Sequence, residues 1–521
     1  MKQFYLCPKF CKTVKHYSGA QFVRDIVAGL IVAVIALPLS IALALASGVE
    51  PARGVYTAIA AGFIVSLLGG SRVQIAGPTA AFATIVAGVV ATQGMNGLFI
   101  ATVLAGILLI LMGVFKLGTL IKFIPTTITV GFTAGIAVTI FVGQIKDFLG
   151  LSYAADLKPI ETIEKIEANI DSISTFSLPA LIIGAISLLI LIVYPKFEKR
   201  VPPSLIAVAV GVLLVRFVPY FRDGVFTIGT LYTIPEGLPK PEFLSFDFSP
   251  ERILAAVPSA FTIALLAAIE SLLSCVVADG MIDSKHNSNA ELVAQGVGNI
   301  ASVFFGGIPA TGAIARTAAN VKNGGRTPVA GMVHAVVLLL ALLFLMSLAA
   351  LIPMPTIAAI LFMVALNMSE YKKFFALCKS APKSDILVLV VTFVLTVVFD
   401  LVVAIVAGLA LTLILFLKRM SDTTTCTLRP DTPAGERHYD INGPLFFGSK
   451  DRISDLLPAD GDTHRITLHL EGVTAMDSTA LSVVRTLIDR CQKRNVAVCL
   501  AGAEGQTEKA LRKYGLSAYL I

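Results

Sequence analysis

Residues 74–81 read Gln74-Ile75-Ala76-Gly77-Pro78-Thr79-Ala80-Ala81, and residues 308–313 read Ile308-Pro309-Ala310-Thr311-Gly312-Ala313. Each segment follows a glycine pair, Gly69-Gly70 or Gly306-Gly307, and breaks a long apolar stretch before a short run of small residues. A helix that starts at such a break has unpaired backbone N–H groups and a partial positive charge at its N-terminus. Two such half-helices that face each other form an anion site, so the matched breaks indicate a transporter's binding site.

The composition indicates an integral membrane protein. Of the 521 residues, 56% are hydrophobic and only 14% are charged, whereas a soluble domain has roughly 25% charged residues. The mean hydropathy is +0.84, and the net charge of +7 suits loops that face anionic lipid rather than nucleic acid.

Enzymatic and metal-binding functions find no support in the sequence. Seven scattered cysteines suggest free thiols rather than disulfides or a zinc site. No nucleotide-binding loop, metal cluster or nucleophile–base arrangement is visible. We therefore expect neither an enzyme nor a bound cofactor.

Fourteen apolar runs divide the chain into two halves. The third and tenth runs are too short or too interrupted for a full crossing of about 20 residues. Their separation of seven predicts two seven-span repeats, about 26–219 and 252–418, which run in opposite directions because seven is odd. The runs lie near residues 26–48, 54–69, 77–93, 97–115, 123–149, 176–195, 203–219, 252–278, 289–306, 311–321, 328–351, 354–376, 384–399 and 400–418.

The loop charges predict the orientation. Lysine and arginine gather on one side of the predicted membrane domain, whereas the opposite loop 150–175 is acidic. By the positive-inside rule, this places both termini in the cytoplasm of a multi-pass protein of the plasma membrane. The basic residues are Arg72, Lys116, Lys122, Lys196, Lys199, Arg200, Lys322, Arg326, Lys372, Lys373, Lys379, Lys383, Lys418 and Arg419.

Three domains follow from these patterns: a cytoplasmic N-terminal segment (1–25), an all-α polytopic membrane domain (26–420) and a small α/β domain (421–521). After Met420 the charge rises, and alternating strand-like and helix-like segments follow. We expect strands at Arg465–Leu470 and Val496–Gly502, and helices at Ser478–Arg494 and Thr507–Tyr514.

Several motifs resemble the sulfate permease (SulP) family of anion transporters, the group that includes prestin and pendrin. The C-terminal part resembles a STAS domain, with Met476-Asp477-Ser478-Thr479 at its signature turn. The membrane motifs are Ala36-Leu37-Pro38-Leu39-Ser40-Ile41-Ala42, Gly77-Pro78-Thr79-Ala80, Glu270-Ser271-Leu272-Leu273-Ser274, Asn289-Ala290-Glu291-Leu292 and the stretch from Phe305 to Thr317.

The resemblance implies a seven-plus-seven inverted repeat with a core domain (spans one to four and eight to eleven) and a gate domain (the remaining spans). It further implies a homodimer in the lipid bilayer and elevator-like sliding of core against gate. The substrate would then lie between the third and tenth spans, lined by the first and eighth. On this chain those positions are Thr79, Ala80, Ala313, Ile314, Ala315, Arg316, Leu37, Pro38, Ser40 and Glu270.

Glu270 is the candidate for ion coupling. It lies in the apolar run Ile263–Val277, where a charge costs about 2.5–3.5 kcal/mol on insertion scales. Some bacterial relatives bind sodium through an Asp here. The Glu of this chain, with Ser274 one turn later, favours H+ over Na+ as the coupling ion. The alternative is a structural carboxylate that pairs permanently with Arg316.

The other candidate site residues also have simpler structural explanations. Arg316 either supplies a positive field or snorkels to water. The Gly/Pro breaks either expose N–H donors to an anion or only allow close packing of the spans. Pro38 either frees backbone carbonyls or makes a simple kink. Asp477 is first of all a helix N-cap, while Ser478 is a phosphorylation candidate by analogy with soluble STAS regulators.

The expected function is secondary active transport of small anions of the sulfate, bicarbonate or dicarboxylate class, by proton-coupled symport with an elevator mechanism. One alternative is a sodium-coupled bicarbonate importer, and another is a passive anion channel. A third is a signalling scaffold whose STAS domain binds a cytosolic partner.

Overall fold

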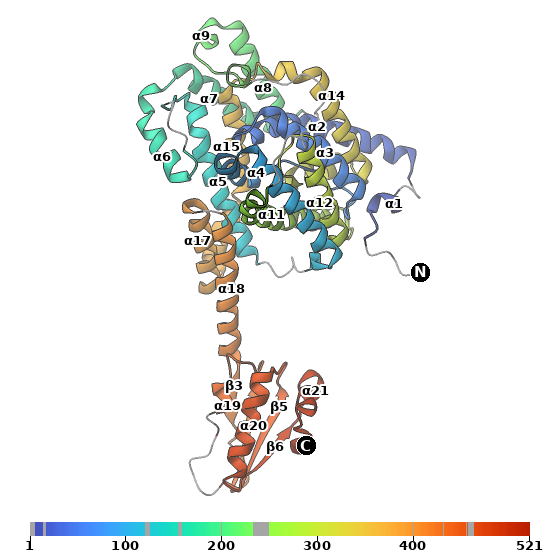
Figure 1. Ribbon diagram of the computed structural model, residues 1–521, viewed down its shortest axis with the longest axis vertical. Coiled ribbons are helices and arrows are strands. Elements are labelled where there is room, and N and C mark those ends of the chain that lie inside the picture. The colour runs from blue at the N-terminus through green and yellow to red at the C-terminus, as the bar shows by residue number, and fades with distance from the viewer. Residues whose placement is uncertain are drawn as a thin grey trace. The chain divides into compact units, whose positions relative to one another are not determined.

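The computed structural model describes residues 6–13, 17–119, 125–154, 159–198, 201–232, 249–399, 401–430, 432–454, 456 and 463–521. The chain divides into two compact units, Met1–Gly408 and Leu409–Ile521 (Figure 1). We call them the helical unit and the C-terminal unit.

The helical unit consists almost entirely of helices, and each of the fourteen predicted apolar runs coincides with a helix or part of one. Nine helical segments in the described part of the chain are long and apolar enough to cross a membrane on their own. The polytopic helical fold is confirmed, while the number of crossings stays a prediction. The helices are α1 (Lys9–Thr13), α2 (Gly19–Ala46), α3 (Pro51–Leu68), α4 (Ala80–Val114), α5 (Thr126–Leu149), α6 (Thr162–Asp171), η3 (Ile173–Thr175), α7 (Leu178–Phe197), α8 (Pro203–Phe217), α9 (Pro219–Arg222), α10 (Ile228–Leu231), α11 (Pro250–Ile282), α12 (Ser288–Phe304), α13 (Ile314–Lys322), α14 (Pro328–Ala349), α15 (Met354–Met368), α16 (Tyr371–Ser380), α17 (Lys383–Val398) and α18 (Leu401–Thr423). Helix α18 begins in this unit, and its residues from Leu409 onward belong to the C-terminal unit.

Helix α2 begins earlier than the predicted run, which starts near residue 26. Asp25 interrupts the hydrophobic pattern, yet its side chain is fully buried inside the helix. Its carboxylate accepts hydrogen bonds from the Tyr17 hydroxyl at 2.8 Å, the Gln21 side chain at 2.9 Å and the Arg326 backbone N–H at 3.0 Å. The charge is therefore satisfied by two nearby side chains and by a backbone N–H from a distant segment, and the helix extends back to the Ser18 cap.

Two other boundaries differ from the predicted runs. The third and fourth runs are joined in α4, with a break at Gly94, where φ is +70°. The run 354–376 is divided, because α15 ends at Met368 and α16 starts after Glu370, whose φ of +42° is left-handed. A non-glycine residue in this conformation does not continue a right-handed helix.

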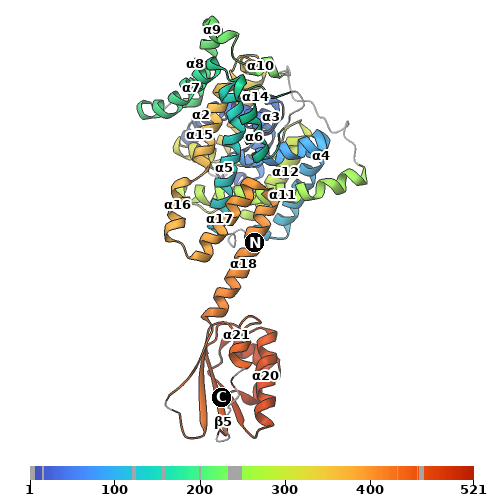
Figure 2. The same ribbon diagram turned by 90° about the vertical axis from the view of Figure 1, so that its left-hand side faces the viewer.

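The helices of this unit form two groups. In the first group, α4 packs on α11 and α12, while α3 and α14 pack on each other and on α2. In the second, α5 packs on α15 and α17, and α7 packs on α8 and α15. Figure 2 shows α4, α11 and α12 together on one side of the unit and α5 beside α17. These groups correspond to the predicted core and gate spans.

Helices α4 and α12 touch through their backbones at a pair of glycines. A Cβ atom added to Gly296 would lie 2.4 Å from the Gly106 carbonyl oxygen, and one added to Gly106 would lie 2.7 Å from the Gly296 carbonyl oxygen. Small residues allow such close helix contacts in membranes.

Gly296→Val is expected to destabilise the helical unit by about 1–3 kcal/mol, because the added methyl groups force α4 and α12 apart. The measurement is the melting temperature of the purified protein in detergent. Gly280→Ala is the control, since a Cβ at that position in α11 meets nothing within 4 Å. Equal melting temperatures for the two variants would contradict the proposed backbone contact.

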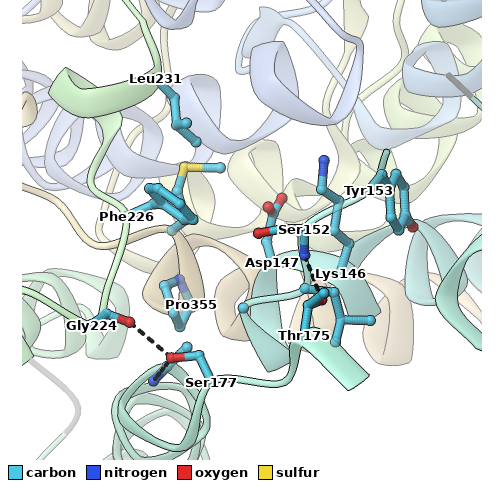
Figure 3. Close-up of a pocket in the computed structure, with 14 residues that line it drawn as sticks. Lys146, Asp147, Ser152, Tyr153, Thr175, Ser177, Gly224, Phe226, Leu231 and Pro355 are labelled. Carbon is cyan, nitrogen blue, oxygen red and sulfur yellow. Dashed lines mark hydrogen bonds between the residues drawn. The ribbon is translucent and has the colours of Figure 1, made fainter. Parts of the chain in front are cut away.

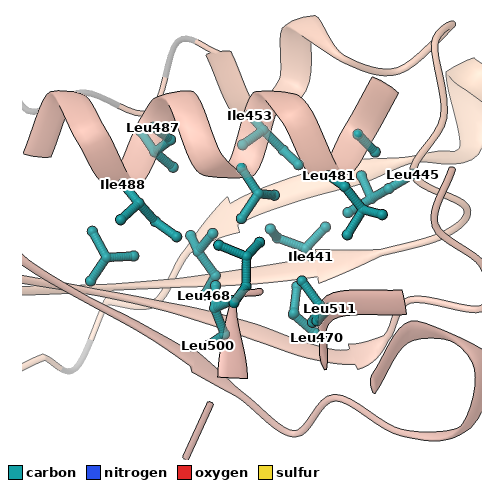
Figure 4. Close-up of a cluster of buried hydrophobic side chains, with 14 of the residues drawn as sticks. Ile441, Leu445, Ile453, Leu468, Leu470, Leu481, Leu487, Ile488, Leu500 and Leu511 are labelled. Carbon is teal, nitrogen blue, oxygen red and sulfur yellow. The ribbon is translucent and has the colours of Figure 1, made fainter. Parts of the chain in front are cut away.

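The C-terminal unit is a four-stranded sheet in the order β3-β4-β5-β6. Strands β3 and β4 are antiparallel, while β4, β5 and β6 are parallel. Leu468, Leu470 and Leu500 of the sheet pack against Leu487 and Ile488 of α20 (Figure 4). The elements are β3 (Thr425–Leu428), β4 (Glu436–Asn442), α19 (Asp451–Ser454), β5 (Arg465–Gly472), α20 (Ser478–Gln492), β6 (Ala497–Ala501), α21 (Gly505–Lys513) and η5 (Ser517–Tyr519).

The predicted α/β architecture of this unit is confirmed. The strands and helices expected after residue 464 correspond to β5, α20, β6 and α21, with ends that differ by a few residues. Strands β3 and β4 and helix α19 were not predicted, because the linker-like prolines and mixed charges before residue 464 hide the alternation of buried side chains.

Candidate functional site

The two sequence breaks lie side by side. Strand β1 (Ala76–Gly77) pairs antiparallel with strand β2 (Thr311–Gly312), with Ala76 opposite Gly312 and Gly77 opposite Thr311. The Ala313 N–H extends the pairing by donating to the Ile75 carbonyl oxygen at 2.8 Å. Helix α4 starts just after β1, and helix α13 starts just after β2. The strand pair therefore brings two helix N-termini, with their unpaired N–H groups, to one place.

Glycine is required at two positions of the strand pair. A Cβ at Gly77, where φ is +156°, would lie 2.6 Å from Nη1 of Arg316. A Cβ at Gly312 would lie 1.7 Å from the Gln74 side-chain nitrogen. The breaks thus do allow close packing, and this packing is what places the helix N-termini together.

Glu270 of α11 lies beside the start of α4. The Thr79 hydroxyl donates to Oε2 of Glu270 at 3.1 Å. Thr79 is the N-cap residue of α4, but its side chain does not cap the helix, because it is turned to the carboxylate instead. Within the described part of the chain, Glu270 forms no ion pair. The alternative of a permanent Glu270–Arg316 pair is therefore absent from this structure.

Arg316 is buried behind the start of α4. Its side chain is only 2% exposed, so it does not snorkel to water. Its Nη2 donates to the Pro78 carbonyl oxygen, while Nε and Nη1 have no hydrogen-bond partner among the described residues. The guanidinium therefore adds a full positive charge to the partial charges of the nearby helix N-termini.

The first turn of α13 is open on one side. Ala80 and Ala313 are nearly buried, whereas the Ile314 side chain is 44% exposed and Ala315 is exposed as well. These residues were predicted to bind the anion, and that role stays a prediction.

A hydrogen-bond network fixes α11 to the strand pair. The Ser274 hydroxyl donates to the Gln74 side-chain oxygen at 2.9 Å, and the Gln74 side-chain nitrogen donates to the Ser271 carbonyl oxygen at 3.1 Å. The Ser271 hydroxyl accepts from the Gly312 N–H at 3.0 Å. Ser274, a predicted ion-coupling residue, therefore has a structural partner here, and its coupling role stays a prediction.

Gln74 and Ser271 were not predicted as site residues. Their signal in the sequence is weak. Gln74 is a polar residue just before the first break, and Ser271 is a polar residue next to Glu270 in a hydrophobic stretch. His334 of α14 is fully buried, and neither of its ring nitrogens has a hydrogen-bond partner among the described residues.

The first predicted span lies next to the site but makes no described hydrogen bond to it. Helix α2 continues through Pro38 from Gly19 to Ala46 and packs against α4 and α13. Leu37 packs in a cluster with Ala58 of α3 and Leu338 of α14, and the buried Ser40 hydroxyl has no described partner. The contribution of Leu37, Pro38 and Ser40 to substrate binding stays a prediction.

Glu291 of α12 anchors the loop that leads into β1. Its fully buried carboxylate accepts from the backbone N–H groups of Gly70 at 2.9 Å and Ser71 at 3.1 Å, and from the Gln295 side chain at 3.0 Å. A Cβ at Gly70 would lie 1.9 Å from the Asn287 carbonyl oxygen. The Gly69-Gly70 pair therefore lets the loop approach α12, and Glu291 holds it there.

Glu291→Ala is expected to loosen this loop, because two buried backbone N–H groups lose their acceptor at about 1–3 kcal/mol each. The measurement is hydrogen exchange of the peptide that contains residues 69–73, followed by mass spectrometry. Exchange should be faster in Glu291→Ala than in Glu291→Gln, which keeps one acceptor oxygen. Exchange at the wild-type rate in both variants would show that another contact holds the loop.

In the C-terminal unit, the signature turn caps a helix. Asp477 is the N-cap of α20, and its carboxylate accepts from the Ala480 N–H at 2.8 Å and the Phe447 N–H at 3.0 Å. Ser478 is exposed and Thr479 is partly buried. The capping role of Asp477 is confirmed, and phosphorylation of Ser478 stays a prediction.

Comparisons with known proteins cover nearly the whole chain. The sulfate permease family profile matches residues 22–392, and the STAS domain profile matches residues 429–520. The putative sulfate transporter YvdB of Bacillus subtilis (strain 168) is 41% identical over 522 residues, which cover 98% of this chain and 96% of that protein. The bicarbonate transporter BicA of a Picosynechococcus species is 30% identical over 522 residues, which cover 94% of this chain and 90% of that protein.

Two solved structures resemble the fold. The transmembrane domain of a cyanobacterial bicarbonate transporter, BicA, aligns with a TM-score of 0.65 at 28% identity and covers 75% of this chain and 98% of its own. The murine anion transporter solute carrier 26 family member A9, in its inward-facing state, aligns with a TM-score of 0.88 at 17% identity and covers 98% of this chain and 90% of its own.

Proposed function

The chain belongs to the sulfate permease family, and from this premise we propose that it carries small oxyanions of the sulfate and bicarbonate class across a membrane together with protons. The observation that supports this proposal is the pairing of β1 with β2, which brings the N-termini of α4 and α13 together beside Glu270.

The anion would bind at the two helix N-termini. Backbone N–H groups of the first turns of α4 and α13 would donate to its oxygens, with Arg316 as the nearest full positive charge. Each helix terminus contributes about 0.3–1 kcal/mol when exposed and more when partly buried. Such weak binding suits a carrier, because the anion must also be released.

Glu270 would couple the anion to a proton. An ionised carboxylate repels an anion about 5 Å away by about 3 kcal/mol at an effective dielectric constant of about 20. Protonation of Glu270 removes this repulsion, so the anion and the proton favour each other's binding by roughly a hundredfold. The Thr79 hydroxyl, which binds the carboxylate at 3.1 Å, lies where the two sites meet.

Proteoliposomes with independently set pH and sodium gradients test this proposal. An inward proton gradient should drive uphill uptake of radiolabelled sulfate or bicarbonate without sodium. Glu270→Gln should abolish uphill uptake, yet leave exchange of labelled for unlabelled anion measurable, because the neutral side chain mimics the protonated acid. Glu251→Gln, at the exposed start of the same helix, is the control and should behave as wild type. Wild-type pH dependence in Glu270→Gln would remove the coupling role.

A sodium-coupled bicarbonate importer is the second candidate. The similarity to a bicarbonate transporter supports it, as does the Thr79 hydroxyl oxygen 3.1 Å from the Glu270 carboxylate, because sodium prefers oxygen ligands. In that case a sodium gradient, and not a pH gradient, would drive bicarbonate uptake in the same proteoliposomes.

The transport movement would be elevator-like. The proposed site is built from α4, α11 and α13. Helices α4 and α11 also line a cavity of about 370 Å³, together with α5, residues 160–162 and the C-terminal end of α17. Movement of the first group past the second would carry the site without taking it apart. We place both termini in the cytoplasm because of the loop charges. We expect a homodimer because of the family resemblance.

Cross-linking across this cavity is expected to stop transport. Gly88→Cys in α4 and Thr396→Cys in α17 both line it, and a reversible bifunctional thiol reagent would join the two helix groups in a background without native cysteines. Flux should fall at least tenfold and return on reduction. The pair Gly88→Cys and Thr92→Cys, both in α4, is the control and should keep its flux. Undiminished flux in a fully cross-linked α4–α17 pair would contradict the movement.

A further inference from the structure

A second cavity lies apart from the strand pair. It has a volume of about 420 Å³ and lies between the C-terminal end of α5, the start of α15 and the segments that follow α5 and precede α7. Cavities of about 300–1,000 Å³ are typical of small-molecule sites. It shares no residue with the Thr79–Glu270 site. Its lining residues are Lys146, Asp147, Gly150, Leu151, Ser152, Tyr153, Thr175, Ser177, Ala180, Gly224, Phe226, Leu231, Met354 and Pro355.

Two opposite charges line this cavity without pairing with each other. Figure 3 shows Asp147 and Lys146 beside each other on one wall. The Lys146 ammonium lies 4.4 Å from the centre of the Tyr153 ring, a cation–π contact. Among the described residues, Asp147 takes part in no hydrogen bond or ion pair. A carboxylate on the wall of a cavity attracts a positively charged group, and Asp147 has no such partner among the described residues.

Two nearby hydroxyl groups, those of Thr175 and Ser177, are hydrogen-bonded within the chain and can each accept one further bond. Thr175 Oγ1 donates to the Ser172 carbonyl oxygen at 2.7 Å, and Ser177 Oγ donates to the Gly224 carbonyl oxygen at 2.8 Å. Thr175 Oγ1 also accepts from the Ser152 N–H at 2.9 Å, and Ser177 Oγ accepts from the Ala180 N–H at 3.4 Å. Each hydroxyl oxygen therefore keeps one lone pair with which it can accept a hydrogen bond from a ligand. The carboxylate and the two hydroxyls are therefore suited to an ammonium group.

A lone inorganic cation does not fit the remaining walls. The cavity is far larger than the roughly 30 Å³ share of a water-sized particle, and Figure 3 shows Phe226 and Leu231 on the wall opposite Asp147. Lys146 would repel a simple cation, and its ammonium is itself free to bind an anionic group. A ligand that carries both charges and an apolar part matches these walls.

We propose that this cavity binds a small zwitterion, with its ammonium group on Asp147, its anionic group on Lys146 and its apolar part on Phe226 and Leu231. A free α-amino acid and the headgroup of phosphatidylethanolamine share this chemistry. The proposal does not depend on anion transport, since none of these residues belongs to the proposed anion site.

Calorimetry with three matched probes tests the charge requirement. The full-length protein is placed in phosphatidylglycerol nanodiscs and titrated with L-leucine, with 3-methylbutylamine, which lacks the carboxylate, and with 4-methylpentanoate, which lacks the ammonium. Leucine should bind at least tenfold more tightly than either analogue. Equal binding of leucine and one analogue would overturn the proposal. A protein that bound neither leucine nor phosphatidylethanolamine would overturn it as well.

Two independent variants test the residues. Asp147→Asn and Lys146→Met should each weaken leucine binding at least tenfold, because each removes one of the two charge contacts. Asp171→Asn, at the exposed end of α6 and outside the cavity, should bind leucine as wild type does. Unchanged leucine affinity in both Asp147→Asn and Lys146→Met would refute the assignment.

Phosphatidylethanolamine nanodiscs distinguish the two sources. If leucine affinity falls at least tenfold there, and native mass spectrometry finds a retained phosphatidylethanolamine that Asp147→Asn loses, the headgroup occupies the cavity. If leucine affinity is the same in both lipids, the ligand is a free zwitterion. Retained phosphatidylethanolamine in wild type and Asp147→Asn alike, without leucine binding, would contradict the site.

Discussion

The antiparallel pairing of Ala76–Gly77 with Thr311–Gly312 is the interaction on which the helical unit depends. Non-helical backbone within a membrane protein is tolerated only where its N–H and C=O groups find partners. Each break exposes such groups, and the strand pair lets the two breaks satisfy each other. Buried side chains satisfy further groups: Asn299 both accepts from the Ala310 N–H at 2.9 Å and donates to the Ala310 carbonyl oxygen at 2.8 Å.

This constraint explains why the first helix group contains many buried polar side chains. Thr57 accepts from the Ile308 N–H at 2.7 Å, Thr317 accepts from the Ile75 N–H at 3.0 Å, and Glu291 holds the loop before β1. Each would be costly alone in an apolar interior. Together they fix two backbone segments that no regular helix could hold, and they leave the first turns of α4 and α13 as the places where donors stay unpaired.

The positions of the breaks and the acidic residue could be predicted, because Gly, Pro and a lone Glu stand out in an apolar sequence. The register of β1 on β2 could not, since two-residue strands have no periodicity. The partners Gln74 and Ser271 were also missed, because side-chain hydrogen bonds to backbone depend on neighbours far apart in the sequence. The start of α2 was predicted too late for the same reason. Asp25 reads as a break in the hydrophobic pattern, and its partner Arg326 is brought close only by the fold.

The separation of Glu270 from Arg316 has a consequence for the charge of the site. Glu270 is bound by the Thr79 side chain, while Arg316 is held by the Pro78 carbonyl oxygen. The neighbouring residues Pro78 and Thr79 thus each bind one of two opposite charges, and these charges form no ion pair with each other. A direct pair would neutralise both groups and fix their geometry. Held apart, the arginine keeps its field at the helix N-termini whether or not Glu270 carries a proton, so protonation changes the net charge of the site from neutral to positive. Under the proposed mechanism, a monovalent anion that entered the protonated site would restore neutrality, which is the condition under which a charge costs least inside a membrane.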